Sequence, residues 1–123
     1  MNASGKVLLV EDEVLVAALA VDALEELGYE TLEVTTAKAA RAIAAGAEKL
    51  SFAVVDIGLP DGHGDTLALE LRKSRPDLPI VIATGYDGAR LDEALRKQPR
   101  TAVLNKPYDI AQLQAAIQAI LRA

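Results

Sequence analysis

The chain has 123 residues, which is enough for one domain with a single hydrophobic core. Half of the residues are apolar and a quarter are charged, as is typical of globular rather than disordered proteins, and the net charge of -5 disfavours a nucleic-acid surface, which needs clustered Lys and Arg. There is no cysteine, no signal-peptide pattern and no apolar run of about 18 residues. We therefore expect one cytoplasmic domain over residues 1–123, of which residues 1–5 form a flexible N-terminus.

The first predicted element is a strand over residues 6–10, where the sequence Lys-Val-Leu-Leu-Val is apolar without alternation. This pattern is typical of a strand that is covered on both faces. The strand runs directly into three acidic residues, Glu11, Asp12 and Glu13. Glu11 and Asp12 could serve a reactive site at the end of the strand, or they could cap the helix that follows.

A helical pattern follows over residues 13–27 and ends at Gly28. The residues predicted to face the core share helical spacing: Ala17, Ala20, Val21, Leu24 and Leu27. Leu15 and Ala18 fall on the opposite side of this helix. We expect them to form a small exposed apolar patch near its start.

The second predicted strand, over residues 30–34, alternates between polar and apolar residues, which suits the half-exposed edge of a sheet. Either Thr35 or Thr36 is the predicted N-cap of an alanine-rich helix over residues 37–47.

The third predicted strand covers residues 52–56 and delivers Asp56 to its last position. A loop rich in Gly, Pro and Asp follows it. A carboxylate at such a strand end is either a structural loop cap or a reactive group. Asp65 is the predicted N-cap of the next helix, which continues through Ser74.

Two more apolar strands are predicted, over residues 79–84 and 101–104, and they lead into Thr84 and Lys106. The helix expected between them, over residues 89–97, has few apolar residues and should be the least stable. Asp109 is the predicted cap of the last helix. The residues on the inner side of that helix are Ile110, Leu113, Ile117, Ile120 and Leu121.

Five strands alternate with five helices in this reading, which predicts a three-layer, doubly wound α/β domain. Its parallel sheet has five strands in the flavodoxin-like order 2-1-3-4-5, with right-handed crossovers. The carboxyl ends of parallel strands lie along one edge, where ligands bind in such sheets. The residues that follow these ends, and that we expect to converge, are Glu11, Asp12, Asp56, Thr84 and Lys106.

The chemistry of these side chains suits phosphoryl transfer onto a carboxylate. Three carboxylates repel one another, so that protons or a cation must compensate them, and a donor set of oxygens without His or Cys suits Mg²⁺. Lys106 can pair with a carboxylate at rest and with a phosphoryl oxygen afterwards. Thr84 and the backbone N–H groups of Gly58 and Gly85 can donate hydrogen bonds to the same group.

In Glu11-Asp12, Asp56 with its downstream Pro60 and Gly64, Thr84, and Lys106-Pro107, the chain resembles a CheY-like response-regulator receiver domain of bacterial two-component signalling. The resemblance covers essentially the full length. It implies that Asp56 is the phosphoacceptor.

The resemblance also implies the roles of the surrounding residues. Asp12 and Asp56 would bind Mg²⁺ directly, together with the backbone carbonyl of Gly58, while Glu11 would act through water, and Mn²⁺ could replace Mg²⁺. Thr84 and Lys106 would sense the phosphoryl group. The peptide bond before Pro107 would be cis, which is cheap only before proline.

Two features depart from the common receiver pattern. Val103 stands where such receivers carry an aromatic switch residue, three positions before the lysine. The fourth strand resembles a subgroup motif that reads Phe-Ala-Thr-Gly-x-Tyr, but Ile82 replaces the Phe and Tyr86 follows Gly85 immediately. Our hypothesis is that Gly85, Tyr86 and the weak fourth helix form the switch.

The resemblance implies a signalling receiver that catalyses only its own phosphorylation and dephosphorylation. The expected partners are a histidine kinase or phosphotransfer protein and a downstream protein effector, with no nucleic acid and no membrane, and we expect a monomer or weak dimer. The chain could also be the receiver segment of a hybrid kinase, a phosphate sink or an unphosphorylated adaptor.

A rival from another class is a flavodoxin-like cofactor-binding or hydrolytic domain. It would need a Gly-rich or Ser/Thr-rich phosphate loop where this chain has acids at 11–13. His63, the only histidine, is expected to be a solvated loop residue, so that the donor histidine comes from another protein.

Overall fold

The structure is a computed structural model that describes residues 5–85 and 98–122. Tyr86 and the helix expected over residues 89–97 lie outside these ranges. The elements follow in the order β1 (Lys6–Val10), α1 (Val14–Glu26), β2 (Thr31–Val34), α2 (Ala37–Ala45), β3 (Leu50–Asp56), β4 (Gly58–Leu59), β5 (Gly62–His63), α3 (Gly64–Ser74), β6 (Ile80–Thr84), β7 (Thr101–Asn105) and α5 (Ile110–Arg122).

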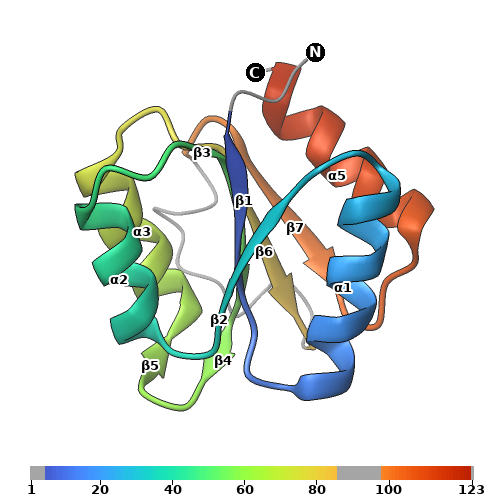
Figure 1. The fold of residues 1–123 in the computed structure, drawn as a ribbon, viewed down its shortest axis with the longest axis horizontal. Helices are drawn as coiled ribbons and strands as arrows, with labels where there is room; N and C mark the ends of the chain where they lie inside the picture. The colour runs from blue at the N-terminus through green and yellow to red at the C-terminus, as the bar shows by residue number, and fades with distance from the viewer. Residues whose placement is uncertain (1–4, 86–97, 123) are drawn as a thin grey trace.

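The main sheet has five parallel strands in the order β2-β1-β3-β6-β7. This is the predicted flavodoxin-like order, and the alternating strand β2 lies at an edge as expected. Figure 1 shows α2 and α3 on one side of the sheet and α1 and α5 on the other. The predicted three-layer α/β architecture is therefore confirmed.

The position of strand β1 between two helical layers explains why its sequence is apolar without alternation. Leu8 and Val10 pack into the core beneath α2 and α3, whereas Val7 and Leu9 pack into the core beneath α1 and α5. All four side chains are at most 1% exposed. A strand between two helical layers needs apolar residues at every position, since successive side chains point to opposite faces.

Two of the predicted helix caps are present. Thr36 Oγ1 accepts a hydrogen bond from the Ala39 backbone N–H at 3.1 Å, and so caps α2. At the start of α5, Asp109 Oδ1 accepts from the Gln112 N–H at 2.8 Å, and Gln112 Oε1 accepts from the Asp109 N–H at 2.9 Å. This reciprocal pair is a capping box, which satisfies two helix-terminal donors at once.

Two sequence-based predictions were wrong. Helix α3 begins at Gly64, with His63 at its N-cap position, so Asp65 lies inside the first turn and its carboxylate accepts from the Thr66 N–H instead. The cause is the short antiparallel hairpin of β4 and β5, which the sequence did not reveal and which carries the chain straight into the helix. Leu121 was expected inside but is 48% exposed. None of the helices in the described ranges is long and apolar enough to cross a membrane.

Candidate functional site

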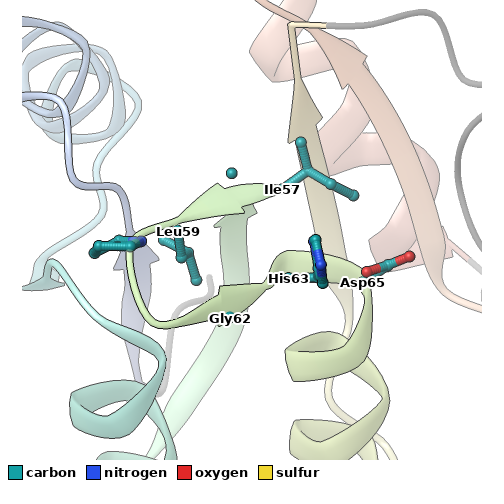
Figure 2. A pocket seen from close by; sticks show the side chains of 7 residues that line it. Ile57, Leu59, Gly62, His63 and Asp65 are labelled. Carbon is teal, nitrogen blue, oxygen red and sulfur yellow. The ribbon is translucent and has the colours of Figure 1, made fainter.

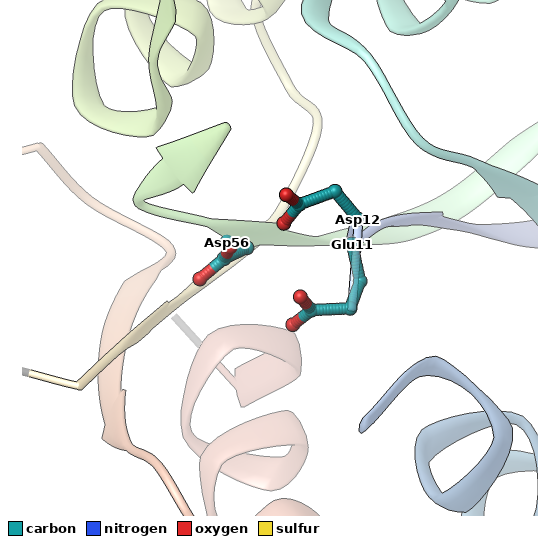
Figure 3. A group of neighbouring side chains, drawn as sticks. All are labelled: Glu11, Asp12 and Asp56. Carbon is teal, nitrogen blue, oxygen red and sulfur yellow. The ribbon is translucent and has the colours of Figure 1, made fainter. Parts of the chain in front are cut away.

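Three carboxylates meet at the carboxyl edge of the sheet, as the sequence predicted. Glu11 and Asp12 follow β1, and Asp56 is the last residue of the adjacent strand β3. One carboxylate oxygen from each lies within 4.8 Å of the others. Figure 3 shows the three side chains converging from the two strand ends. The sheet brings them together because β1 and β3 are parallel neighbours that end at the same edge.

Lys106, which follows β7, reaches into this group. Its Nζ lies 3.0 Å from Asp56 Oδ1 and 3.2 Å from Glu11 Oε1. It also lies 2.9 Å from Glu13 Oε1, the shortest of the three ion pairs. Sequence reasoning did not assign Glu13 to the site. Its place in the acidic run after β1 was the available signal, but the sequence could not show which way its side chain points.

Burial divides the acids of the site into two kinds. The side chains of Glu11 and Asp56 are 2% and 4% exposed, and that of Lys106 is 12% exposed. The Glu13 side chain, by contrast, is 61% exposed. Glu11 and Asp56 therefore depend on Lys106, or on another cation, for compensation of their charge, because water barely reaches them.

The electrostatics of Glu11 and Lys106 reflect this arrangement. Burial raises the pKa of Glu11 above its usual value, and the nearby charge of Asp56 raises it further, against the hydrogen bond from the Glu13 N–H and the charge of Lys106. Burial alone would lower the pKa of Lys106. Hydrogen bonds to Glu13 and Asp56, with the charges of Asp56 and Glu11, outweigh burial and hold that pKa above its usual value, so that Lys106 is a cation at neutral pH.

Thr84 and Pro107 complete the edge. Thr84 ends β6 and is 2% exposed, and its backbone carbonyl accepts a hydrogen bond from the Lys106 N–H at 2.8 Å. The peptide bond between Lys106 and Pro107 is cis, the form that the resemblance implied. The backbone of β6 therefore fixes the start of the segment that carries the lysine.

An open pocket of about 490 Å³ lies over these groups. It is lined by Asp12, Glu13, Asp56, Ile57, Gly58, Gly85 and Lys106. Six of these seven residues carry a polar side chain or an accessible glycine backbone, so the pocket suits a small polar group rather than an apolar ligand. Gly58 and Gly85 both border it, as their predicted roles require.

The donor set fits a hard divalent cation. Glu11, Asp12 and Asp56 supply only carboxylate oxygens, and no described residue adds a Cys or His ligand to this group. Asp12 is more exposed than the other two, which leaves room for water ligands beside it. Mg²⁺ prefers a few carboxylate ligands together with retained waters. Asp12 and Asp56 are the residues that would hold it.

A second pocket, of about 630 Å³, borders the β4–β5 hairpin (Figure 2). Its lining residues include Ile57, Leu59, His63 and Asp65. His63 is exposed at the end of the hairpin. Gly64, the next residue, packs tightly against the end of β3: a Cβ there would clash with the Asp56 carbonyl oxygen and lie 2.6 Å from the Ile57 Cα.

The predicted apolar patch on α1 is present and larger than expected. Leu15 is 79% exposed and Ala18 is exposed as well, and they are joined by Val14 and Leu19, which are 82% and 70% exposed. We call these four residues the α1 patch. The sequence pattern missed Val14 and Leu19, which fall on the outer side of the helix.

Two other residues bear on the site. Val103, on β7, is 40% exposed, so the position of the usual aromatic switch holds a small surface side chain. Tyr108 was not singled out in the sequence, yet burial, with the charge of Glu11, raises its pKa to about 12. Tyr86, which our hypothesis places in the switch with Gly85, lies outside the described residues.

Comparison with known proteins identifies the family. The family model for the response regulator receiver domain matches residues 7–118. The chain is 36% identical over 110 residues to the photosynthetic apparatus regulatory protein RegA of Rhodovulum sulfidophilum, covering 89% of this chain and 60% of RegA. It is 32% identical over 123 residues to the sensor kinase CckA of Brucella abortus, covering 98% of this chain but 13% of CckA.

Solved structures agree with this assignment. A response regulator protein from Burkholderia pseudomallei, with a phosphorylated aspartic acid, calcium ion and citrate, is 27% identical and superimposes with a TM-score of 0.81. The match covers 94% of this chain and 67% of that one. With the family model matched over nearly all of its length, and with its acids and lysine gathered at the carboxyl edge of a CheY-like sheet, the chain belongs to the response regulator receiver domain family.

Proposed function

We propose that this domain accepts a phosphoryl group on Asp56 from a phosphohistidine of a histidine kinase or phosphotransfer protein, and later loses it to water. The observation that carries this proposal is the surroundings of Asp56. Its carboxylate is 4% exposed, lies 3.0 Å from Lys106 Nζ, and shares a group of oxygens with Glu11 and Asp12. The phosphorylated aspartic acid of the related B. pseudomallei response regulator supports the same chemistry.

In the transfer, a carboxylate oxygen of Asp56 attacks phosphorus and the P–N bond of the phosphohistidine breaks. The electron pair of that bond stays on the imidazole, and the product is a mixed anhydride on Asp56. In dephosphorylation, water attacks phosphorus, the P–O bond to Asp56 breaks, and inorganic phosphate leaves. Lys106 and the hydroxyl of Thr84 donate hydrogen bonds to the phosphoryl oxygens throughout.

Mg²⁺ is the proposed cofactor, and Mn²⁺ could replace it. Asp12 and Asp56 would bind the ion directly with the Gly58 carbonyl, and Glu11 would act through water. The support is the oxygen-only donor set, in which each carboxylate lies near the other two. When bound, such an ion offsets the negative charge of the acids and of the incoming phosphoryl oxygens.

The domain would pass on its state through protein contacts in the cytoplasm, as a monomer or weak dimer and without nucleic acid. We assign the α1 patch to docking of the phosphodonor, because it is apolar and lies on the helix that follows the acids. The face formed by the fourth predicted helix, β7 and α5, which includes Val103, would present the output; that helix, over residues 89–97, lies outside the described residues. Beyond its own phosphorylation and dephosphorylation, the domain would catalyse no reaction.

A second candidate role concerns the protein in which the domain acts. The chain is similar to a segment of the sensor kinase CckA, so it could act as the receiver segment of a hybrid kinase or as a phosphate sink. Both contexts use the same chemistry on Asp56. They differ in where the phosphoryl group goes next, which a transfer assay with candidate phosphotransfer proteins would separate.

The proposed chemistry is tested by intact mass measurement after incubation with acetyl phosphate, with and without Mg²⁺. We expect a gain of one phosphoryl mass that requires Mg²⁺, that is absent in Asp56→Asn and that persists in the control Asp77→Asn, whose side chain is 99% exposed. If neither acetyl phosphate nor a candidate kinase loads the folded wild type, the domain is an unphosphorylated adaptor and the proposal is wrong.

A further inference from the structure

Within the described residues, the ammonium group of Lys106 lies among three carboxylates. Its three partners are Glu13 Oε1 at 2.9 Å, Asp56 Oδ1 at 3.0 Å and Glu11 Oε1 at 3.2 Å. A lysine ammonium carries three N–H donors and no acceptor. Two of them form the hydrogen bonds to Glu13 Oε1 and Asp56 Oδ1, and Glu11 Oε1 lies within ion-pair distance. A phosphoryl oxygen that approaches Lys106 therefore competes with these carboxylates and favours the release of one of them.

The three partners differ in what that release costs. Glu11 is 2% exposed, so without Lys106 its charge would stay buried and uncompensated. Asp56 is the residue that receives the phosphoryl group. Glu13 is 61% exposed, and water can replace the lysine at its carboxylate at little cost. Glu13 is therefore the partner that Lys106 can leave most easily.

Among the residues that the structure describes, Lys106 is the partner that accounts for the position of the Glu13 side chain. Glu13 is the N-cap residue of α1, but its side chain makes no capping hydrogen bond. The helix uses only its backbone, whose carbonyl accepts from the Ala17 N–H at 2.9 Å. The carboxylate instead points to Lys106 and borders the pocket that also contains Asp56.

We propose that Glu13 is a positioning residue of this site: it holds Lys106 Nζ in the unphosphorylated protein and is exchanged for a phosphoryl oxygen when Asp56 is loaded. This inference rests on the proposed phosphorylation of Asp56. Glu13 keeps the lysine over the pocket. Because it competes with the phosphoryl group for Lys106, it lowers the affinity of the site for that group.

The test uses beryllofluoride, a tetrahedral mimic of the phosphoryl group, with Mg²⁺ on the full chain. Glu13→Ala removes the competing carboxylate with its charge, whereas Glu13→Asp keeps the charge but is one methylene shorter and withdraws from Lys106. We expect both variants to bind beryllofluoride about two- to fivefold more tightly than the wild type, the range open to an exposed ion pair. The control Glu25→Ala removes an exposed acid at the far end of α1 and should bind as the wild type does.

The outcomes are distinct. Tighter binding in Glu13→Ala alone would assign the effect to charge and overturn the inference, as would unchanged binding in both variants. A wild type that does not bind beryllofluoride would overturn the proposed function and this inference with it. An independent readout needs neither metal nor mimic: exchange of the Lys106 Nζ protons with water, measured by NMR, should be faster in both Glu13 variants, and an unchanged rate would contradict the resting contact.

Discussion

Asp61 caps a helix that begins 24 positions earlier in the sequence: its Oδ1 accepts a hydrogen bond from the backbone N–H of Ala37 at 2.7 Å. Its Oδ2 accepts from the Lys38 N–H at 3.0 Å. Asp61 lies in the turn between β4 and β5, in the hairpin that begins two residues after Asp56. The loop next to the proposed phosphoacceptor therefore holds the first turn of α2, where the unpaired N–H groups and the positive end of the helix dipole favour an acid.

Replacement of Asp61 by Ala should lower the stability of the protein at neutral pH. The two backbone hydrogen bonds lower the pKa of Asp61 below its usual value of 3.8, so its contribution is complete above that value and is lost as the pH falls through the lower folded value. Urea unfolding at pH 7 and pH 2.5 should show a midpoint difference between wild type and Asp61→Ala that shrinks at the acid pH. Asp77→Ala, at a 99% exposed side chain, is the control and should change little.

The other end of α2 is capped by Arg75, which follows α3. Its Nε donates to the Ala44 carbonyl at 3.1 Å and an Nη to the Gly46 carbonyl at 3.1 Å. We expect Arg75→Ala to lower the free energy of unfolding by about 1 to 2 kcal/mol, because carbonyls at the helix C-terminus lose charged donors. Arg41→Ala breaks only a surface pair with Glu70 and should cost about 0 to 1 kcal/mol in the same urea titration. Equal costs for both variants would refute the capping role.

Gly64 and Gly58 form a matched pair of substitutions on either side of the hairpin. A Cβ at Gly64 would clash with the Asp56 carbonyl oxygen, whereas a Cβ at Gly58 would meet nothing within 4 Å. Gly64→Ala should therefore destabilise the protein by about 1 to 3 kcal/mol and disturb the end of β3, which carries Asp56. Gly58→Ala should leave stability nearly unchanged. Thermal unfolding of both variants checks this, and a neutral Gly64→Ala would show that the strand end can shift freely.

Lys106→Met should destabilise the metal-free protein strongly at pH 7. Glu11 and Asp56, at 2% and 4% exposure, would then lose their ammonium partner, which costs about 3 to 5 kcal/mol for a broken buried pair. Burial already raises the pKa of Glu11 above its usual 4.5. A carboxyl whose pKa is raised in the folded state destabilises the folded protein when it is ionised, and this effect is lost as the pH falls toward 4.5. The stability difference between the wild type and Lys106→Met should therefore shrink on acidification.

The measurement is urea unfolding in EDTA at pH 7 and pH 5. A deficit that is equal at the two pH values would mean that the acids do not depend on Lys106. The variant Lys106→Arg keeps the charge and should recover part of the lost stability, since a guanidinium can still reach the exposed edge of the site but differs in shape from an ammonium.

The architecture, and the place where the acids meet, could be predicted from the sequence. Continuous apolar runs marked strands covered on both faces, and their alternation with helices predicted a parallel sheet. Parallel strands end at one edge, and this alone predicts that Glu11, Asp12 and Asp56 lie together, as they do in the structure. The N-caps at Thr36 and Asp109 could also be predicted, because a capping residue and its helix are neighbours in the chain.

Contacts between side chains that are far apart in the sequence depend on the packed fold. Glu13 and Lys106 are separated by 93 positions, and Asp61 and Ala37 by 24. Neither contact could be predicted from the sequence, nor could the hairpin that moves the start of α3 to Gly64. Periodicity and caps are local signals, whereas the direction of an exposed or loop side chain depends on the packed surfaces around it, which exist only once the sheet and its two helical layers have assembled.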